Sequence, residues 1–221
     1  MDQLLDQFFN LEIMAKAGPI VLHGLWMTLL LCLAVIPSGL AAGLVVALLS
    51  IARPRALRWP VLVFVDFFRA VPPLVLLIFV YSGLPFVGLR PTPFAAVCIA
   101  FLLNNGAYYG EIFRAGIESI GAGQWEAARS SGLRYGQTLL HVVLPQAVRN
   151  VLPDLISNTV EVVKLTSLAS VVALPELLYS ADMARSVTYN TSPIMLAAAI
   201  YLLMLWPCVR LLSQLEHRMS P

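Results

Sequence analysis

Five long apolar stretches constrain the fold of this chain more than any other feature of its sequence. Each is long enough to supply the ~20 residues that a helix needs to cross ~30 Å of hydrocarbon. They lie at about 20–50, 60–82, 93–117, 149–173 and 194–214. A bilayer offers no water to backbone amides, so each stretch is predicted to be an α-helix that satisfies its own hydrogen bonds.

The composition agrees with a membrane protein. Of the 221 residues 59% are hydrophobic and only 12% are charged. A soluble domain of this length has too little interior to bury that much apolar surface. We therefore predict an all-α integral membrane protein, with one transmembrane domain over residues 1–221 and a five-helix core at 20–215.

Residues 1–18 precede the first apolar stretch and are polar to amphipathic. Phe8, Phe9 and Leu11 are available to contact a membrane surface, so this segment predicts a short interfacial helix. Three acidic residues come before its only lysine, whereas a cleaved signal peptide begins with a positive region.

The basic residues predict the orientation of the spans. With the N-terminus outside, ten arginines fall in cytoplasmic segments and three basic residues fall in outer ones. The ten are Arg53, Arg55, Arg58, Arg69, Arg114, Arg129, Arg134, Arg149, Arg210 and Arg218, and the three are Lys16, Arg90 and Arg185. Positive residues stay on the cytoplasmic side, so we predict N-outside and C-inside, with a periplasmic segment 1–18 and a cytoplasmic loop 118–148.

The segment 123–145 is the longest one without spanning character. It is helix-like at 124–128, breaks at Gly132, and resumes from Gln137 until Pro145. An amphipathic helix, a glycine turn and a second short helix favour an ordered surface knob. On composition alone, an ordinary solvated loop is the commoner outcome.

The chain lacks the sequence motifs of common catalytic sites. A phosphate-binding P-loop needs Gly-Lys before Ser or Thr, and the two lysines, Lys16 and Lys164, follow Ala and Val. Neither an HExxH helix nor a GxSxG elbow is present. The net charge of +2 is too small to indicate a nucleic-acid partner. We predict a subunit that is not an enzyme and has no cofactor of its own.

Several polar residues fall at membrane depth. They are Asn104 and Asn105 in the third stretch and Glu161, Lys164, Thr166 and Ser167 in the fourth. At ~1.5 Å per residue, both asparagines and Glu161 are predicted to meet near the midplane. A carboxylate in lipid is a functional candidate by default, but Glu161 and Lys164 are also spaced to pair at i, i+3. Both interpretations stay open; for Glu111 and Arg114 at the same spacing, structural pairing is favoured.

Two pairs of glycines indicate close helix packing. Gly39 and Gly43 lie four residues apart in the first stretch, as do Gly106 and Gly110 in the third. Such spacing lets helix backbones approach closely in a membrane. Packing within the subunit is the favoured use, and a subunit interface is the alternative.

An ordered set of motifs carries a family resemblance. Glu126-Ala127-Ala128 is followed, after three intervening residues, by Gly132, and then by Leu144-Pro145. This resembles the EAA loop of permease subunits of ATP-binding cassette importers, and flanking segments are similar to those of the polar amino acid branch. The flanking matches are Phe68-Arg69, Pro72, Glu111–Ile117, Gln124-Trp125, Gln146-Ala147, Lys164, Thr166–Ser170 and Pro175–Leu178. The resemblance covers roughly residues 20–215, with departures at Ala70-Val71, where Gly-Thr is usual, and at Leu165, where Asp is common.

The resemblance implies a mechanism and a set of partners. The knob would seat in a groove of a separate ATPase subunit, two copies of which bind ATP and Mg. The coupling residues would be Glu126, Ala127, Ala128, Gly132, Leu144 and Pro145. A second permease subunit, identical or homologous, would complete the path in a bacterial inner membrane. An extracytoplasmic solute-binding protein would deliver a polar or charged amino acid or a derivative.

The path residues would then have defined roles. Glu161 would hold an ammonium or cationic group of the substrate, and Asn104 or Asn105 would assist with its carboxylate. The alternatives are a secondary transporter or channel that is not powered by ATP, and a membrane scaffold or sensor without transport.

Overall fold

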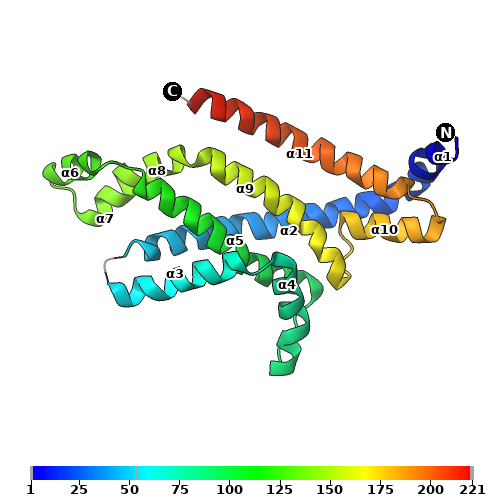
Figure 1. Cartoon of the computed structure of the whole chain (residues 1–221), viewed down its shortest axis with the longest axis horizontal. Helices are drawn as coiled ribbons and strands as arrows, with labels where there is room; N and C mark the ends of the chain where they lie inside the picture. The colour runs from blue at the N-terminus through cyan, green and yellow to red at the C-terminus, as the bar shows by residue number, and fades with distance from the viewer. Residues whose placement is uncertain (1, 53, 220–221) are drawn as a thin grey trace.

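The computed structural model describes residues 2–52 and 54–219, and these residues form an all-helical chain. The first half comprises α1 (Asp2–Phe9), α2 (Leu11–Ser50), α3 (Arg55–Ala70), α4 (Pro73–Ile78), η1 (Phe79–Gly83), η2 (Leu84–Val87) and α5 (Pro93–Glu118). The second half comprises α6 (Ala122–Ser130), α7 (Tyr135–Thr138), η3 (Leu139–Val143), α8 (Leu144–Asn150), α9 (Leu152–Leu165), η4 (Thr166–Val172), α10 (Leu177–Thr188) and α11 (Ser192–Met219). Figure 1 shows α6 and α7 at one end of the long axis and α1 and α10 at the other.

Within the described residues, three helical segments are long and apolar enough to cross a membrane. They are Gln3–Ser50, Leu152–Val172 and Ser192–Gln214. A fourth arises if α3 and Pro73–Val87 are counted as one bent span. The predicted third span is a continuous helix, α5, but it is less apolar because polar and glycine residues are buried along it. Helical membrane architecture is therefore confirmed, whereas five spans and the N-outside orientation stay predictions.

The predicted span at 60–82 is not a single straight helix. α3 ends at Ala70, and α4 begins at Pro73 after a bend of 102°. Val71 is extended at φ −78° and ψ 126°, because a residue before proline is disfavoured in the α-region. The segment from α4 to η2 consequently turns away from the bundle as an arm (Figure 1).

The predicted interfacial helix over 1–18 has the wrong boundary. The chain breaks at Asn10, whose Oδ1 accepts a hydrogen bond of 3.1 Å from the Ile13 amide and caps the start of α2. Side-chain capping of this kind favours a new helix at that point. Residues 11–18 therefore belong to the 40-residue α2, and only α1 is a separate short helix.

The core of the subunit lies where α2 crosses α5. A Cβ atom added to Gly43 would lie 2.9 Å from the backbone nitrogen of Gly110. One added to Gly110 would lie 2.9 Å from the Cβ of Val46, and one added to Gly39 would lie 3.1 Å from the Cβ of Asn105. These glycines therefore serve packing within the subunit, which is the favoured of the two predicted uses.

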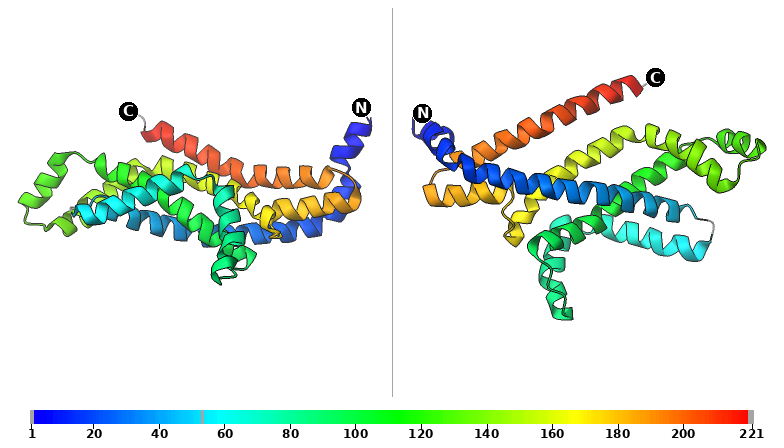
Figure 2. Two further views of the ribbon diagram at one scale, coloured as in Figure 1. Left: turned by 60° about the horizontal axis from the view of Figure 1, so that its bottom comes forward. Right: turned by 180° about the vertical axis from the view of Figure 1, so that it is seen from behind.

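A helix that the apolar pattern did not indicate, α10, packs beside the N-terminal half of α2. Figure 2 shows the two helices side by side in both views. Their contact is close at Gly24, where an added Cβ atom would lie 2.7 Å from the Glu176 carbonyl oxygen. Buried apolar residues from α2, α10 and α11 form a second, smaller core there: Ala17, Val21, Leu177, Ala181, Ala184 and Ala197.

Candidate functional site: the α6–α7 knob and the α9–α11 cavity

The predicted helix–turn–helix knob is present between α5 and α9. α6 ends at Ser130, and Gly132 has a φ of +89°. The Leu133 amide donates to the Ala128 carbonyl at 3.3 Å, which closes the end of the helix. The Arg134 amide then donates to Oε1 of Gln137 at 2.9 Å and opens α7. A left-handed turn followed by a capped helix start is an ordered structure, so the prediction of a knob is confirmed.

One face of α6 is free of contacts with the rest of the subunit, and the other is held. Glu126 and Ala127 are exposed, whereas Ala128 is buried. The ring of Trp125 stacks on that of Tyr135, with centroids 5.3 Å apart and an interplanar angle of 22°. Of the α6 residues predicted to meet a partner, Glu126 and Ala127 thus point outward, whereas Ala128 faces the interior.

The helix at the end of the knob, α8, is docked onto α5. Pro145 is exposed in the first turn of α8, and Leu144 packs against the core. A Cβ atom added to Gly116 would lie 2.9 Å from the carbonyl oxygen of Ala147, so α8 touches α5 backbone to backbone. The side chain of Asn150 donates to Oγ of Ser119 at 3.0 Å. The knob is therefore joined to α5 through α8.

A chain of charges joins α3 to the C-terminal end of α5. Arg114 pairs with Glu111, and its Nη1 lies 2.7 Å from Oε2 of Glu118. Nη1 of Arg69 on α3 lies 3.7 Å from Oε1 of Glu111. The predicted pairing of Glu111 with Arg114 is confirmed. Sequence reasoning missed Arg69 and Glu118 as further members, although Glu118 lies four residues after Arg114, within reach on one helix face.

The two asparagines predicted near the midplane are both buried. Nδ2 of Asn104 donates to the Phe68 carbonyl of α3 at 3.0 Å. Nδ2 of Asn105 makes no hydrogen bond within the described residues, and its Cβ faces Gly39 of α2. Neither asparagine is joined by a hydrogen bond to Glu161 in the described part of the chain. The shared depth of the three residues near the midplane stays a prediction.

Glu161 and Lys164 form the predicted i, i+3 pair on α9. Nζ of Lys164 lies 2.6 Å from Oε1 of Glu161, and the two side chains are 51% and 60% exposed. The pair thus faces outward from the single subunit and remains accessible to another molecule.

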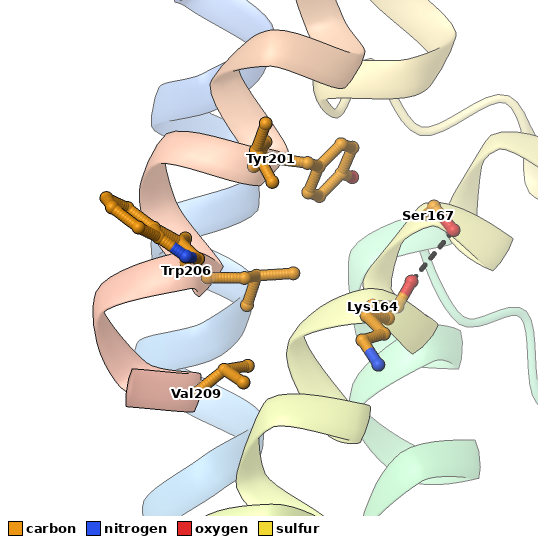
Figure 3. A pocket seen from close by; sticks show the side chains of 7 residues that line it. Lys164, Ser167, Tyr201, Trp206 and Val209 are labelled. Atoms are coloured by element: carbon orange, nitrogen blue, oxygen red, sulfur yellow. Dashed lines mark hydrogen bonds between the residues drawn. The ribbon is translucent and has the colours of Figure 1, made fainter. Parts of the chain in front are cut away.

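A cavity of about 550 Å³ separates α9 from α11. It is lined by Lys164, Ser167, Tyr201, Leu202, Leu205, Trp206 and Val209. Figure 3 shows Lys164 and Ser167 on one wall and Tyr201 extending toward them from the other. Thr166 is fully buried instead, and its hydroxyl donates to the Val163 carbonyl at 2.6 Å.

The far wall of this cavity was missed by sequence reasoning. Tyr201 and Trp206 lie in a long apolar stretch, which signals a span but not the side of the helix that faces the bundle. The described residues contain no group of three His, Cys, Asp or Glu side chains placed to hold a metal ion.

Comparisons with known proteins place these features in a family. The profile of the family described as "binding-protein-dependent transport system inner membrane component" matches residues 39–221. The probable amino-acid ABC transporter permease protein YckA of Bacillus subtilis is 38% identical, over 89% of this chain and 87% of its own length. The probable glutamine ABC transporter permease protein GlnM of the same organism is 35% identical, over 89% and 91%. A crystal structure of an amino acid ABC transporter with histidines contains a chain that is 35% identical, with a TM-score of 0.84, over 93% of this chain and 97% of that one.

Proposed function

The chain belongs to the family of binding-protein-dependent transport system inner membrane components, and on that premise we propose that it is the membrane-spanning permease subunit of an ATP-driven amino acid importer. Its apolar helices place it in the inner membrane. The relatives named as amino-acid and glutamine permeases support an amino acid as the transported solute. For this chain we propose a polar or charged amino acid or a derivative.

The assembly that this function needs includes partners outside the chain. A separate ATPase, in two copies, binds ATP and Mg and supplies the energy. A solute-binding protein delivers the substrate, and a second permease, identical or homologous, completes the path. The exposed face of α6 supports docking of the ATPase. Ala127 on this face is small enough to let another protein approach closely, and Glu126 beside it offers a carboxylate.

The observation that carries the coupling role is the continuous contact from α6 to α5. Gln146 of α8 hydrogen-bonds Gln124 of α6 at 3.4 Å, and α8 meets α5 at the Gly116–Ala147 contact. A push on α6 is therefore passed to the helix that packs most closely on α2. Closure of the ATPase pair would tilt these helices together and turn the path from inward-facing to outward-facing.

Substrate passage is proposed along the exposed pair on α9 and the cavity beside it. Glu161 offers a carboxylate to an ammonium group, and Lys164 offers a cation to a carboxylate. The ammonium and carboxylate groups of a zwitterionic solute can therefore replace the ion pair by binding Glu161 and Lys164 respectively. The asparagines Asn104 and Asn105 and the hydroxyls of Thr166 and Ser167 remain proposed members of the path.

Valine substitutions at two glycines of this region, Gly132 and Gly136, test the coupling role. Gly132→Val places a β-branched residue at φ +89°, a conformation that costs any L-residue roughly 1–2 kcal/mol. Nothing lies within 4 Å of the added Cβ atom, so the strain is confined to the turn. In the complete complex in proteoliposomes, we expect ATP-driven uptake to fall at least about tenfold while the subunit stays in the membrane.

The matched control is Gly136→Val, an exposed position in α7 with equally open space and no positive φ. Its uptake should stay close to that of the wild type. Normal uptake and normal ATPase stimulation in Gly132→Val would show that the knob does not couple. Uptake that survives ATP depletion in the wild-type complex would instead support a secondary transporter or channel.

The substrate role of Glu161 has its own test. Glu161→Gln removes the charge of the pair but keeps its size, and we expect uptake to fall at least about fivefold without any change in binding by the solute-binding protein. The control is Glu12→Gln, because Glu12 forms a similar exposed pair with Lys16, at 2.7 Å, near the start of α2. Equal uptake by both variants would leave Glu161 with a purely structural pairing role.

A further inference from the structure

Glu176, at the start of α10, is a fully buried carboxylate. Its Oε1 accepts a hydrogen bond of 2.7 Å from the Tyr179 amide, and its Oε2 accepts one of 2.8 Å from the Leu178 amide. Oε2 also accepts a bond of 3.2 Å from the hydroxyl of Tyr201 on α11. Burial of a carboxylate is unfavourable unless donors replace water, and these three donors do so.

The backbone around Glu176 is fixed to α2. The Leu177 amide donates to Oγ1 of Thr28 at 3.0 Å, and Thr28 is itself fully buried. At Gly24 the two backbones meet so closely that an added Cβ atom would lie 2.7 Å from the Glu176 carbonyl oxygen. The carboxylate is therefore held at a defined place on α2, independently of α11.

Tyr201 links this fixed point to α11. Its phenol also lies within hydrogen-bonding reach of the hydroxyls of Thr28 on α2 and Thr166 on η4. We call Glu176, Tyr201, Thr28 and Thr166 the Glu176 cluster. Its members come from α2, η4, α11 and the start of α10, so four parts of the chain meet in one polar contact.

The start of α11 is held by the Asn10 amide, which donates to Oγ of Ser192 at 2.9 Å, and by Ala197 in the second core, whereas the helix beyond Tyr201 is largely exposed. Leu202, Leu203 and Trp206 are exposed in the single subunit, and the cavity separates this part of the helix from α9. The other hydrogen-bonding side chains shown on α11 beyond its first turn, Cys208 and Ser213, bond to carbonyls of the same helix. Beyond the first turn of α11, the Glu176 cluster is thus the polar side-chain contact that the described residues of this helix make with other parts of the chain.

We propose that Glu176 is a positioning residue for substrate passage: it holds Tyr201, and through Tyr201 it fixes the wall of the α9–α11 cavity opposite Lys164 and Ser167. This inference rests on the proposed function, because it assigns a residue to the path of the importer. Tyr201 is at once a lining residue of the cavity and the partner of Glu176. Loss of the contact leaves the cavity wall free to shift while the end of α10 stays in place.

Two variants separate positioning from helix capping. Glu176→Asp keeps a residue that is preferred at a helix N-cap, but its side chain is one methylene shorter and loses reach to Tyr201. Glu176→Gln is a poorer cap, yet it keeps the length needed to contact the phenol. A positioning role predicts that uptake follows the order wild type, Gln, Asp. A capping role predicts the opposite order for the two variants.

The measurement is the initial rate of ATP-driven uptake by the complete complex in proteoliposomes, with subunit abundance and substrate-free ATPase activity recorded alongside. Glu176→Asp and Tyr201→Phe should each lower the maximal rate at least about fivefold, with abundance and substrate-free ATPase activity unchanged. Because both remove one contact, the double variant should be no worse than either single variant. Tyr189→Phe is the control for loss of a phenol, since Tyr189 is 90% exposed beyond the end of α10.

Wild-type uptake by Glu176→Asp or by Tyr201→Phe would overturn the inference, as would lower uptake by Glu176→Gln than by Glu176→Asp. Additive losses in the double variant would also contradict it. These results leave the proposed function intact, because the wild-type complex still imports. A wild-type complex without ATP-driven uptake would remove the proposed function and this inference together.

Discussion

Two helix pairs in this subunit are built in opposite ways. α2 and α5 meet through glycines, with backbone close to backbone at Gly43 and Gly110. α9 and α11 border a cavity of about 550 Å³, and beside it Tyr201 of α11 bonds the buried carboxylate of Glu176. In lipid, small residues gain association energy from close van der Waals contact. The first pair is therefore a fixed frame, and the second pair encloses space that can be filled.

The difference shows how one short chain can combine a close-packed helix pair with a pair that borders a cavity. The knob is docked on α5, a member of the tight pair, through Gly116 and Ala147. The exposed Glu161–Lys164 pair lies on α9, a member of the open pair. The knob is therefore joined to the close-packed half of the subunit, and the cavity lies in the other half.

The largest expected effect comes from loosening the frame. A Cβ atom at Gly43 would lie 2.9 Å from backbone atoms of α5, and overpacking of this kind typically costs about 1–3 kcal/mol. We expect Gly43→Ala to lower the melting temperature of the detergent-solubilised subunit and its abundance in the membrane. Gly18→Ala, on the same helix with nothing within 4 Å, should leave both unchanged or raise them. Equal melting temperatures would mean that α2 and α5 are not a close-packed frame.

Filling the open pair should affect transport but not folding. Leu205 lines the cavity, so Leu205→Trp adds a ring to space that is already available. We expect unchanged abundance and melting temperature, and uptake that falls about tenfold as the passage is narrowed. Leu203→Trp, an exposed position on the same helix outside the cavity lining, is the control. A large loss of stability in Leu205→Trp would show that α9 and α11 are packed as tightly as the frame.

The smallest effect concerns the contact between the two pairs. The hydroxyl of Tyr109 on α5 lies 2.8 Å from Oγ1 of Thr159 on α9, and a bond of this kind contributes about 1 kcal/mol. Thr159 keeps its own bond to the Leu155 carbonyl, so Tyr109→Phe leaves no new unpaired hydroxyl on α9. We expect a melting temperature lower by a few degrees with uptake retained. A loss of uptake without any thermal shift would place Tyr109 in the path instead of the support.

The sequence predicted the knob well because its signals are local. Gly132 marks the turn by its freedom at positive φ, and Pro145 falls in the first turn of α8, where proline is tolerated. The bend between α3 and α4 was not predicted, although Pro72 and Pro73 sit inside the apolar stretch and disfavour a continuous helix. α10 was not predicted, because its 12 residues are fewer than the ~20 that a membrane span needs.

The path was less predictable because depth along a helix does not fix direction around it. The rise per residue of a helix predicted similar membrane depths for Asn104 and Glu161. Asn104, however, bonds the Phe68 carbonyl, while Glu161 faces outward. Tyr201 and Glu176 are separated by 25 residues and lie on different helices. A uniformly apolar stretch such as α11 carries no periodicity that would show which residues face the interior.

The unbroken length of α2 has a geometric consequence for the whole subunit. Forty residues at 1.5 Å each make a rod of ~60 Å, about twice the ~30 Å of hydrocarbon. A pivot of about 5° at its Ser50 end sweeps the opposite tip through roughly 5 Å. Because α10 is fastened to that distant half, a small angular change on one side of the bilayer becomes a displacement of molecular size on the other.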